Sequence, residues 1–481
     1  MSAAPDSSST TTATSSPGNP SGLRGVPVAP VGAARPLWKV FLFFLAPMLL
    51  SNILQSLSGT INNVYVGQML GVSALAAVSS FFPVMFFFIA FIIGLGAGAS
   101  VLIGQAWGAR DAAKAKAVAG TTLTVGLLLG LAIAVFGGVF TTPMLAMLGT
   151  PPDVLADSTR YARIMLIAMP GVFLFLLATA MLRGVGDTIT PLLTLLISTA
   201  IGLVVTPALI RGWGGLPQLG VAAGAWASVL SFAVATTWLG FRLRQKKSPL
   251  APDAEFFRSL RIQPHLLKAV LKIGVPTGVQ MIVVALAEVV LLSMVNSYGS
   301  NATAAYGAVN QVVAYVQFPA ISIAITTSIL GAQAIGAGRA NRLGAIVQTA
   351  LGMNLVLTGG LVLLGYLFSR PLMGFFITSA PVIEIAQNLL HIMLWSMVLF
   401  GMASAVSGIM RASGSVLVPT LITIACILGV EVPVAWLMSR HFGLGLDGIW
   451  IAYPVTFGAM LLLQTAYYRL VWRKKSIGRL V

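Results

Sequence analysis

Two glutamates lie inside long apolar stretches of the sequence, where an ionisable group can bind and release a cation. Glu288 lies in the apolar run from about 267 to 296, and Glu431 lies in the run from about 416 to 439. A charged side chain costs ~2.5–3.5 kcal/mol or more at the centre of a bilayer, so such residues are functional candidates. Burial disfavours the charged form of a carboxyl, so each would hold a proton when sealed and release it when water enters.

Three further polar residues are expected at about the depth of these glutamates. At 1.5 Å per helical residue, Glu288 and Glu431 each lie roughly 12–14 Å below the same end of their helices. Asn310 and Gln311 lie about as far from that end, and His391 is a little nearer to it. We therefore expect ion coupling at Glu288, Glu431 and His391, with Asn310 and Gln311 lining a substrate cleft.

A purely structural role is the alternative for each coupling candidate. Glu288 would then be a neutral glutamate that is hydrogen-bonded between helices. Glu431 stands close to Pro433 and would form hydrogen bonds with the backbone of a kinked helix. His391 would be a polar residue whose hydrogen bonds serve only the structure.

A second set of polar residues follows one face of the first apolar run. Asn52, Gln55 and Asn62 are spaced by three and seven residues, which places them on roughly one helical face. Asn63 and Tyr65 follow directly. Such a face is expected to point toward a cleft, as candidate substrate-lining residues, or to form hydrogen bonds with a neighbouring helix.

The composition places all these residues in a helical membrane protein. The chain of 481 residues is 57% hydrophobic and 8% charged, with a mean hydropathy of +0.95, whereas soluble domains carry about 25% charged residues. The apolar runs are continuous rather than alternating, which excludes a β-barrel. Each is about long enough to cross a bilayer, and we expect an all-α polytopic protein with twelve transmembrane helices.

The basic residues set the orientation of these helices. If the amino terminus is cytoplasmic, nearly all of them fall on the cytoplasmic side, as the positive-inside rule requires. The exceptions are Arg160, Arg163, Arg211, Arg370 and Arg440. We expect an integral protein of the bacterial cytoplasmic (inner) membrane with both termini in the cytoplasm. The formal charge of +17 does not indicate nucleic-acid binding, because the basic residues stand at the ends of apolar runs.

Short motifs recur along the chain at a near-constant offset, which indicates a duplication. QAWGA from Gln105 matches QAIGA from Gln333, and MLRGVGDTITP from Met181 matches IMRASGSVLVP from Ile409, both 228 positions apart. The repeat predicts two homologous six-helix bundles related by an axis along the membrane normal. In each QAxGA motif we expect the glycine to break the helix in an interfacial cap.

The duplication and the composition together divide the chain into five units. They are a disordered Ser/Thr/Pro-rich cytoplasmic tail (1–36), an N-terminal lobe (37–241), a basic cytoplasmic linker (242–266), a C-terminal lobe (267–470) and a basic cytoplasmic tail (471–481). The single cysteine, Cys426, lies in an apolar run and is expected to be a small core residue. The sequence has no cysteine or histidine cluster with metal-ligand spacing.

Several motifs resemble those of the multidrug and toxic compound extrusion family. They are NNVYVG from Asn62, IGQAWGA from Ile103, RGVGDT from Arg183 and GVAAGAW from Gly220, and the similarity covers residues 37–470. The resemblance implies two six-helix lobes around a central cleft. It also implies an ion-driven antiporter that expels amphipathic, often cationic, compounds, and some members use a glutamate near Glu288.

This sequence departs from the family at other acidic positions. Asn62 stands where many members have an aspartate in the first helix, and Thr206 precedes Pro207 where many have another. Phe400 and Gly401 occupy the region in which some members carry an acidic residue. We therefore do not expect the amino-terminal proton site that part of the family uses.

The expected function is secondary transport by alternating access, without a cofactor and driven by a proton or sodium gradient. Few oxygen ligands are available for sodium, which favours protons. The alternative is a lipid-linked precursor flippase, which would need arginines in the cleft. A P-loop and the paired groups of a membrane-embedded enzyme are absent from the sequence, so we expect no enzymatic activity. The expected partners are small amphipathic or cationic molecules and membrane lipids, and we expect a monomer.

Overall fold

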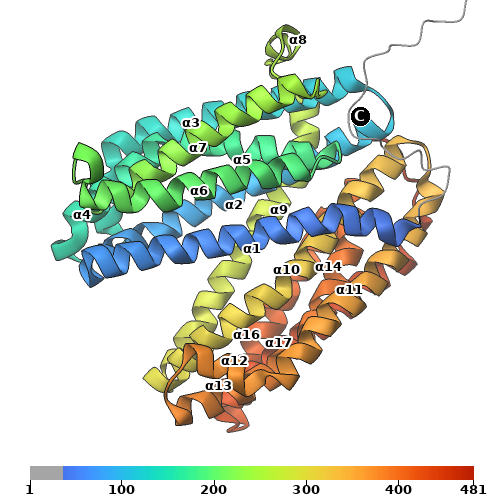
Figure 1. Ribbon diagram of the computed structural model, residues 1–481. Coiled ribbons are helices and arrows are strands. Elements are labelled where there is room, and N and C mark those ends of the chain that lie inside the picture. The colour runs from blue at the N-terminus through green and yellow to red at the C-terminus, as the bar shows by residue number, and fades with distance from the viewer. Residues whose placement is uncertain (1–35) are drawn as a thin grey trace, which may run out of the picture.

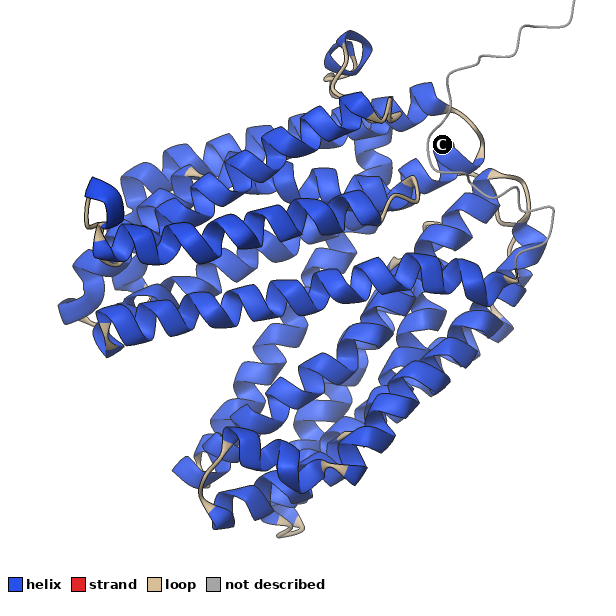
Figure 2. Ribbon diagram, viewed as in Figure 1, coloured by secondary structure: helices blue, strands red, loops and turns tan. Residues whose placement is uncertain are grey.

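The chain is almost entirely helical in the computed structural model, which describes residues 36–481 (Figures 1 and 2). The N-terminal lobe consists of α1 (Leu37–Leu70), α2 (Val72–Gly108), α3 (Ala112–Met147), α4 (Pro152–Ile167), α5 (Met169–Gly184), α6 (Ile189–Arg211) and α7 (Ala222–Gln245). The C-terminal lobe consists of α9 (Pro264–Asn296), α10 (Ser300–Gly336), α11 (Leu343–Leu367), α12 (Ser369–Phe376), α13 (Ala380–Met393), α14 (Ser396–Ala412), α15 (Leu417–Cys426), α16 (Val432–Trp436) and α17 (Gly445–Leu470). The all-α prediction is confirmed. The tail expected at 1–36 lies, apart from Pro36, outside the described residues.

Twelve membrane spans form the two lobes when one bent pair is counted as a single span. Eleven helical segments in residues 36–481 are long and apolar enough to cross a bilayer by themselves. The twelfth span is α4 with α5, which meet at a bend of 53°. Pro170 lies in the first turn of α5, where its missing N–H and its ring interrupt the helix.

The C-terminal lobe contains interruptions that hydrophobic periodicity does not show. Its counterpart of the α4–α5 bend is the break at residues 394–395, between α13 and α14. The span that begins with α15 contains two π-helical turns, Ile427–Glu431 and Leu437–His441. Single π-turns within α-helices are frequent at functional sites.

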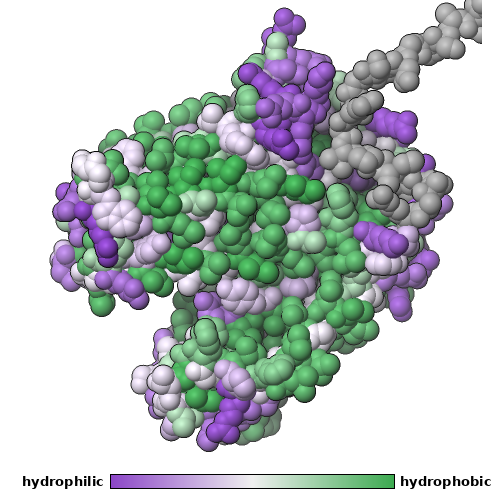
Figure 3. Space-filling model, in the orientation of Figure 1, coloured by the Kyte–Doolittle hydropathy of each residue, from purple (hydrophilic) through white to green (hydrophobic). Residues whose placement is uncertain are grey.

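The two lobes meet at one end of the molecule and diverge toward the other. Figure 1 shows them joined near the marked C terminus, and Figure 3 shows a deep notch between them at the opposite end. A hydrophobic cluster joins the lobes near the closed end, with Phe41, Leu45 and Val101 from the N-terminal lobe and Ile273 and Ile323 from the C-terminal lobe. Both lobes carry many exposed apolar side chains, as expected of helices that contact lipid.

The linker between the lobes is docked on α3. It contains the short helix α8 (Ala254–Arg258), whose first turn is capped by Asp253. Lys116 of α3 forms ion pairs with Asp253, at 3.2 Å, and with Glu255. Thr121 donates a hydrogen bond of 3.0 Å to the carbonyl oxygen of Arg261.

We expect Asp253→Asn to loosen this docked linker at neutral pH. Partial burial opposes ionisation of Asp253, but the Phe256 N–H and the Lys116 ammonium outweigh it and hold the pKa of this carboxyl below its usual value. The stabilisation is therefore present above the ordinary pKa and is lost as the pH falls through the lowered one. Loss of a cap and a half-exposed ion pair costs about 1 kcal/mol.

Hydrogen–deuterium exchange of residues 248–263 measures this effect. The exchange of these amides should be several-fold faster in the variant near pH 7, and the difference should vanish in acid. Asp153→Asn, in the first turn of α4, is the matched control and should leave the linker unchanged. Equal protection of the linker in Asp253→Asn and the parent protein would contradict the docking role.

Candidate functional site

Glu288 lies at the centre of a hydrogen-bonded cluster inside the C-terminal lobe. The hydroxyl of Tyr306 on α10 donates to Glu288 Oε2 at 2.6 Å, and the hydroxyl of Tyr453 on α17 donates to the same oxygen at 3.1 Å. The two hydroxyl oxygens are 3.0 Å apart. The carboxyl of α9 is thus directed at two neighbouring helices of its own lobe rather than at lipid.

Aromatic rings fix the position of these tyrosines. The ring of Tyr306 stacks on that of Trp450, with centroids 5.5 Å apart and planes inclined by 8°. Phe457 lies beside Tyr453, with centroids 6.2 Å apart. Both tyrosines and Trp450 are buried, whereas Glu288 keeps a partly exposed surface. A molecule that approaches Glu288 from its exposed side therefore meets a carboxyl group whose Oε2 already accepts two hydrogen bonds.

Glu431 joins the same part of the lobe. It is 4% exposed and ends the π-helical turn Ile427–Glu431. The turn that ends at Glu431 packs against α9, the helix that carries Glu288. Two carboxylates in low-dielectric surroundings repel each other, so the pair favours a bound proton or another cation.

The other residues predicted for this site are distributed differently. Asn310 lies one turn after Tyr306 and within reach of its hydroxyl, whereas Gln311 is exposed. His391 is exposed on α13, where its Nε2 lies 3.1 Å from Ser369 Oγ and its carbonyl oxygen accepts a hydrogen bond from Tyr366. The contacts of His391 thus lie on α11 and α12 rather than with Glu288.

In the N-terminal lobe, one residue of the polar stripe connects the two lobes. Asn52 donates a hydrogen bond of 3.0 Å to Ser322 Oγ on α10. The Asn62 amide oxygen lies next to Gly224 of α7. The remaining members are exposed or half-buried on α1: Gln55, Asn63 and Tyr65. Their role in cleft lining stays a prediction.

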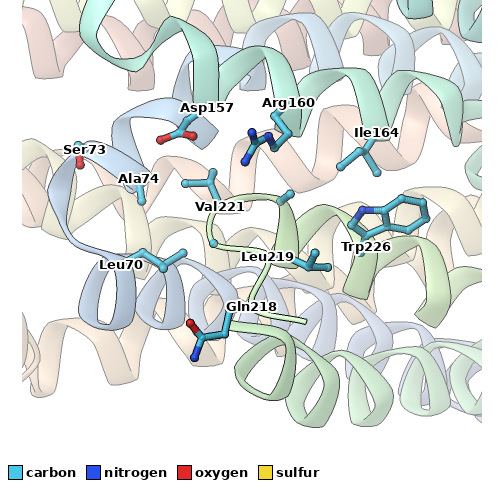
Figure 4. Close-up of a pocket in the computed structure, with 12 residues that line it drawn as sticks. Leu70, Ser73, Ala74, Asp157, Arg160, Ile164, Gln218, Leu219, Val221 and Trp226 are labelled. Carbon is cyan, nitrogen blue, oxygen red and sulfur yellow. The ribbon is translucent and has the colours of Figure 1, made fainter. Parts of the chain in front are cut away.

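A pocket of about 580 Å³ lies where α1 ends, α2 and α7 begin, and α4 passes (Figure 4). Asp157 and Arg160 project from α4 toward it, and Trp226 and Gln218 line other sides. Nothing in the sequence assigned a site role to Asp157 or Arg160. Within residues 36–481, no group of three His, Cys, Asp or Glu side chains is arranged to hold a metal ion.

Twelve spans in two repeated bundles, with buried carboxyls inside one of them, define the class of this protein. It is an integral membrane protein built from two homologous lobes, a repeat arrangement that is found among membrane transporters. The MatE family profile matches residues 47–208 and 276–437, one match in each lobe. The chain therefore belongs to the MatE family, and the resemblance to multidrug and toxic compound extrusion proteins is confirmed.

Individual relatives agree with this assignment. "Probable multidrug resistance protein YoeA" of Bacillus subtilis (strain 168) is 47% identical over 445 residues, which cover 92% of this chain and 96% of that protein. "Multidrug export protein MepA" of Staphylococcus aureus (strain COL) is 24% identical over 419 residues, covering 85% and 89%. A solved structure titled as the outward-facing conformation of a multidrug resistance MATE family transporter of the MOP superfamily has the same fold. Its TM-score is 0.82 at 23% identity, with 90% of this chain and 95% of that chain covered.

Two residues of the site were missed by sequence reasoning. Tyr306 and Tyr453 hold Glu288, yet an isolated tyrosine in an apolar span is most simply interpreted as core. A weak signal was present for Tyr306, because it precedes Asn310 by one helical turn.

Proposed function

We propose that this protein is a secondary antiporter that exports amphipathic, often cationic, compounds in exchange for protons. The observation that supports this best is the cluster of Glu288, Tyr306 and Tyr453 beside Glu431. The names of the relatives, which refer to multidrug resistance and export, support the cargo class.

Proton exchange at Glu288 follows from the hydrogen-bonding capacity of the cluster. When the carboxyl is ionised, both tyrosine hydroxyls donate to Oε2, which offsets part of the cost of a charge in the membrane. When the carboxyl is protonated, its own O–H becomes a donor and one hydroxyl turns to accept it. Glu288 can thus bind and release a proton without a large rearrangement of α10 and α17, the helices that carry the two tyrosines.

Cargo recognition in this proposal combines charge with flat apolar surface. An organic cation neutralises one member of the Glu288 and Glu431 pair, so it competes with the proton. The rings of Tyr306 and Trp450 belong to the same cluster, and aromatic rings attract organic cations.

The proposed orientation in the membrane places both termini on the cytoplasmic side. The notch between the two lobes then opens to the outside of the cell. The protein acts as a monomer in the bacterial cytoplasmic membrane.

Transport of a fluorescent organic cation in proteoliposomes tests this function. We expect an imposed proton gradient to drive dye movement against its concentration and an imposed sodium gradient of the same size to leave it unchanged. Vesicles that contain no protein provide the background. Transport driven by the sodium gradient alone would show that sodium, and not the proton, is the coupling ion. The absence of transport under both gradients would contradict antiport.

A further inference from the structure

The repeated QAxGA motif places one glutamine of each lobe against the other lobe. Gln105 lies near the end of α2, and Gln333 lies at the homologous position of α10. Gln105 Nε2 donates a hydrogen bond of 2.8 Å to the carbonyl oxygen of Ala412, at the end of α14. Gln333 Nε2 donates one of 3.0 Å to the carbonyl oxygen of Gly184, at the end of α5.

These two hydrogen bonds are copies of one another. The two donors are 228 positions apart, and so are the two acceptors, Gly184 and Ala412. Each lobe therefore supplies one glutamine and one acceptor carbonyl to the same seam. A contact that the duplication preserves on both sides, with Gln105 buried and Gln333 half-buried, indicates that the lobes close symmetrically at this point.

The glycines of the motif bring the two helices into direct backbone contact there. A Cβ added at Gly108 would overlap the carbonyl oxygen of Gln333, and one added at Gly336 would overlap that of Gln105. The left-handed residues of the turns are instead Arg110, with φ of 60°, and Gly338, with φ of 72°. Helices α2 and α10 thus end at Gly108 and Gly336, as predicted, but these glycines are not left-handed and instead permit the close crossing of α2 and α10.

The carboxy-terminal residues add a third bond to this seam. The backbone N–H of Leu480 donates a hydrogen bond of 2.8 Å to Gln105 Oε1, so both ends of the Gln105 amide are engaged. The Leu480 side chain lies against Gly414 and packs with apolar residues of both lobes. The seam lies near the C terminus marked in Figure 1, at the end remote from the notch.

We propose that Gln105 and Gln333 form a reciprocal latch that holds the closed end of the transporter shut, with Leu480 as its cover. This inference rests on the proposed alternating-access function. For the protein to open at its closed end, both glutamine hydrogen bonds must break together, because each of them joins the same two lobes. Water that enters the opened seam satisfies the released amides and carbonyls, so the latch is reversible.

Cysteine accessibility at Val101 tests the latch. Val101 is 1% exposed, lies one turn before Gln105 and belongs to the cluster that joins the lobes. In a Cys426→Ala background, Val101→Cys is labelled with a membrane-impermeant maleimide added to the face that carries the C terminus. We expect labelling to be slow in the parent and about fivefold faster in Gln105→Ala and in Gln333→Ala.

A glutamine within one lobe provides the matched control. Gln464 is buried and donates a hydrogen bond of 2.8 Å to the carbonyl oxygen of Pro419, and both residues belong to the C-terminal lobe. Gln464→Ala should leave labelling of the Val101→Cys protein unchanged. Equal acceleration by Gln464→Ala, or parental labelling rates in both latch variants, would overturn the proposal. Where the alanine variants do not fold, Gln105→Asn and Gln333→Asn keep the amide, shorten its reach and should act in the same direction.

Removal of the cover gives a second, independent measurement. Deletion of residues 476–481 should accelerate labelling in the parent and have a smaller effect in the Gln105→Ala background, because the bond from Leu480 to Gln105 is already lost there. Labelling needs neither cargo nor an ion gradient. Accelerated labelling without any gradient-driven transport would therefore refute the antiporter and leave the latch, whereas normal transport with unchanged labelling would refute the latch alone.

Discussion

Glu288→Gln should reduce proton-driven export of an organic cation to no more than roughly a tenth of the parental initial rate. Glutamine preserves the size of the side chain and can still accept a hydrogen bond from Tyr306 or Tyr453. It cannot take up or release a proton, so the exchange that drives export is lost while the C-terminal lobe stays folded. The measurement is the initial rate of dye movement in proteoliposomes under a fixed proton gradient.

The same substitution at a solvent-facing position provides the control for this result. Glu384 is exposed on α13, and Glu384→Gln should export at the parental rate. Parental export by Glu288→Gln would remove Glu288 from the coupling step. In that case Glu431→Gln becomes the decisive variant, because Glu431 is the buried carboxyl beside the cluster.

The second large effect is expected from the crossing of α2 and α9. Gly94 and Gly98 on α2 face Gly274 and Gly278 on α9, so a GxxxG pattern on each helix meets the other. A Cβ added at Gly94 would overlap the carbonyl oxygen of Gly274, and one added at Gly98 would overlap that of Val270. These neighbours are backbone atoms and cannot turn aside as a flexible side chain does.

We therefore expect Gly94→Ala and Gly98→Ala each to destabilise the protein by about 1–3 kcal/mol, and the double variant to yield little folded protein. Thermal unfolding in detergent, followed by size-exclusion chromatography, measures both outcomes. Gly352→Ala and Gly359→Ala on α11 are the controls, because a Cβ at either position meets no atom within 4 Å. An unchanged melting temperature in Gly98→Ala would show that α2 and α9 can separate without cost.

The fold could be predicted largely from the sequence because a membrane imposes simple rules. Long apolar runs must be helices, and motifs repeated 228 positions apart must come from homologous bundles. The interruptions could not be predicted in this way. The bend at Pro170 and the π-helical turn that ends at Glu431 change the local backbone without changing the apolar pattern.

The candidate site could be predicted only in part. Glu288 and Glu431 stand out because charge in lipid is costly, and the structure places them on elements that pack against each other. His391 was expected at a similar depth, but its position on α13 directs it to Ser369. Depth along a helix can be counted from the sequence, whereas the direction in which a side chain points depends on how each helix is rotated against its neighbours.

The class of protein, its helical spans and its two costly carboxyls could be predicted from the sequence, because each follows from the transfer of groups between water and lipid. The duplication could be predicted from the repeated motifs. The tertiary structure alone decided that Tyr306 and Tyr453 hold Glu288, and that the repeated glutamines at 105 and 333 join opposite lobes. Both arrangements depend on the packing of helices that are far apart in the chain. Packing is set by shape and by the pairing of buried polar groups, which neither composition nor periodicity records.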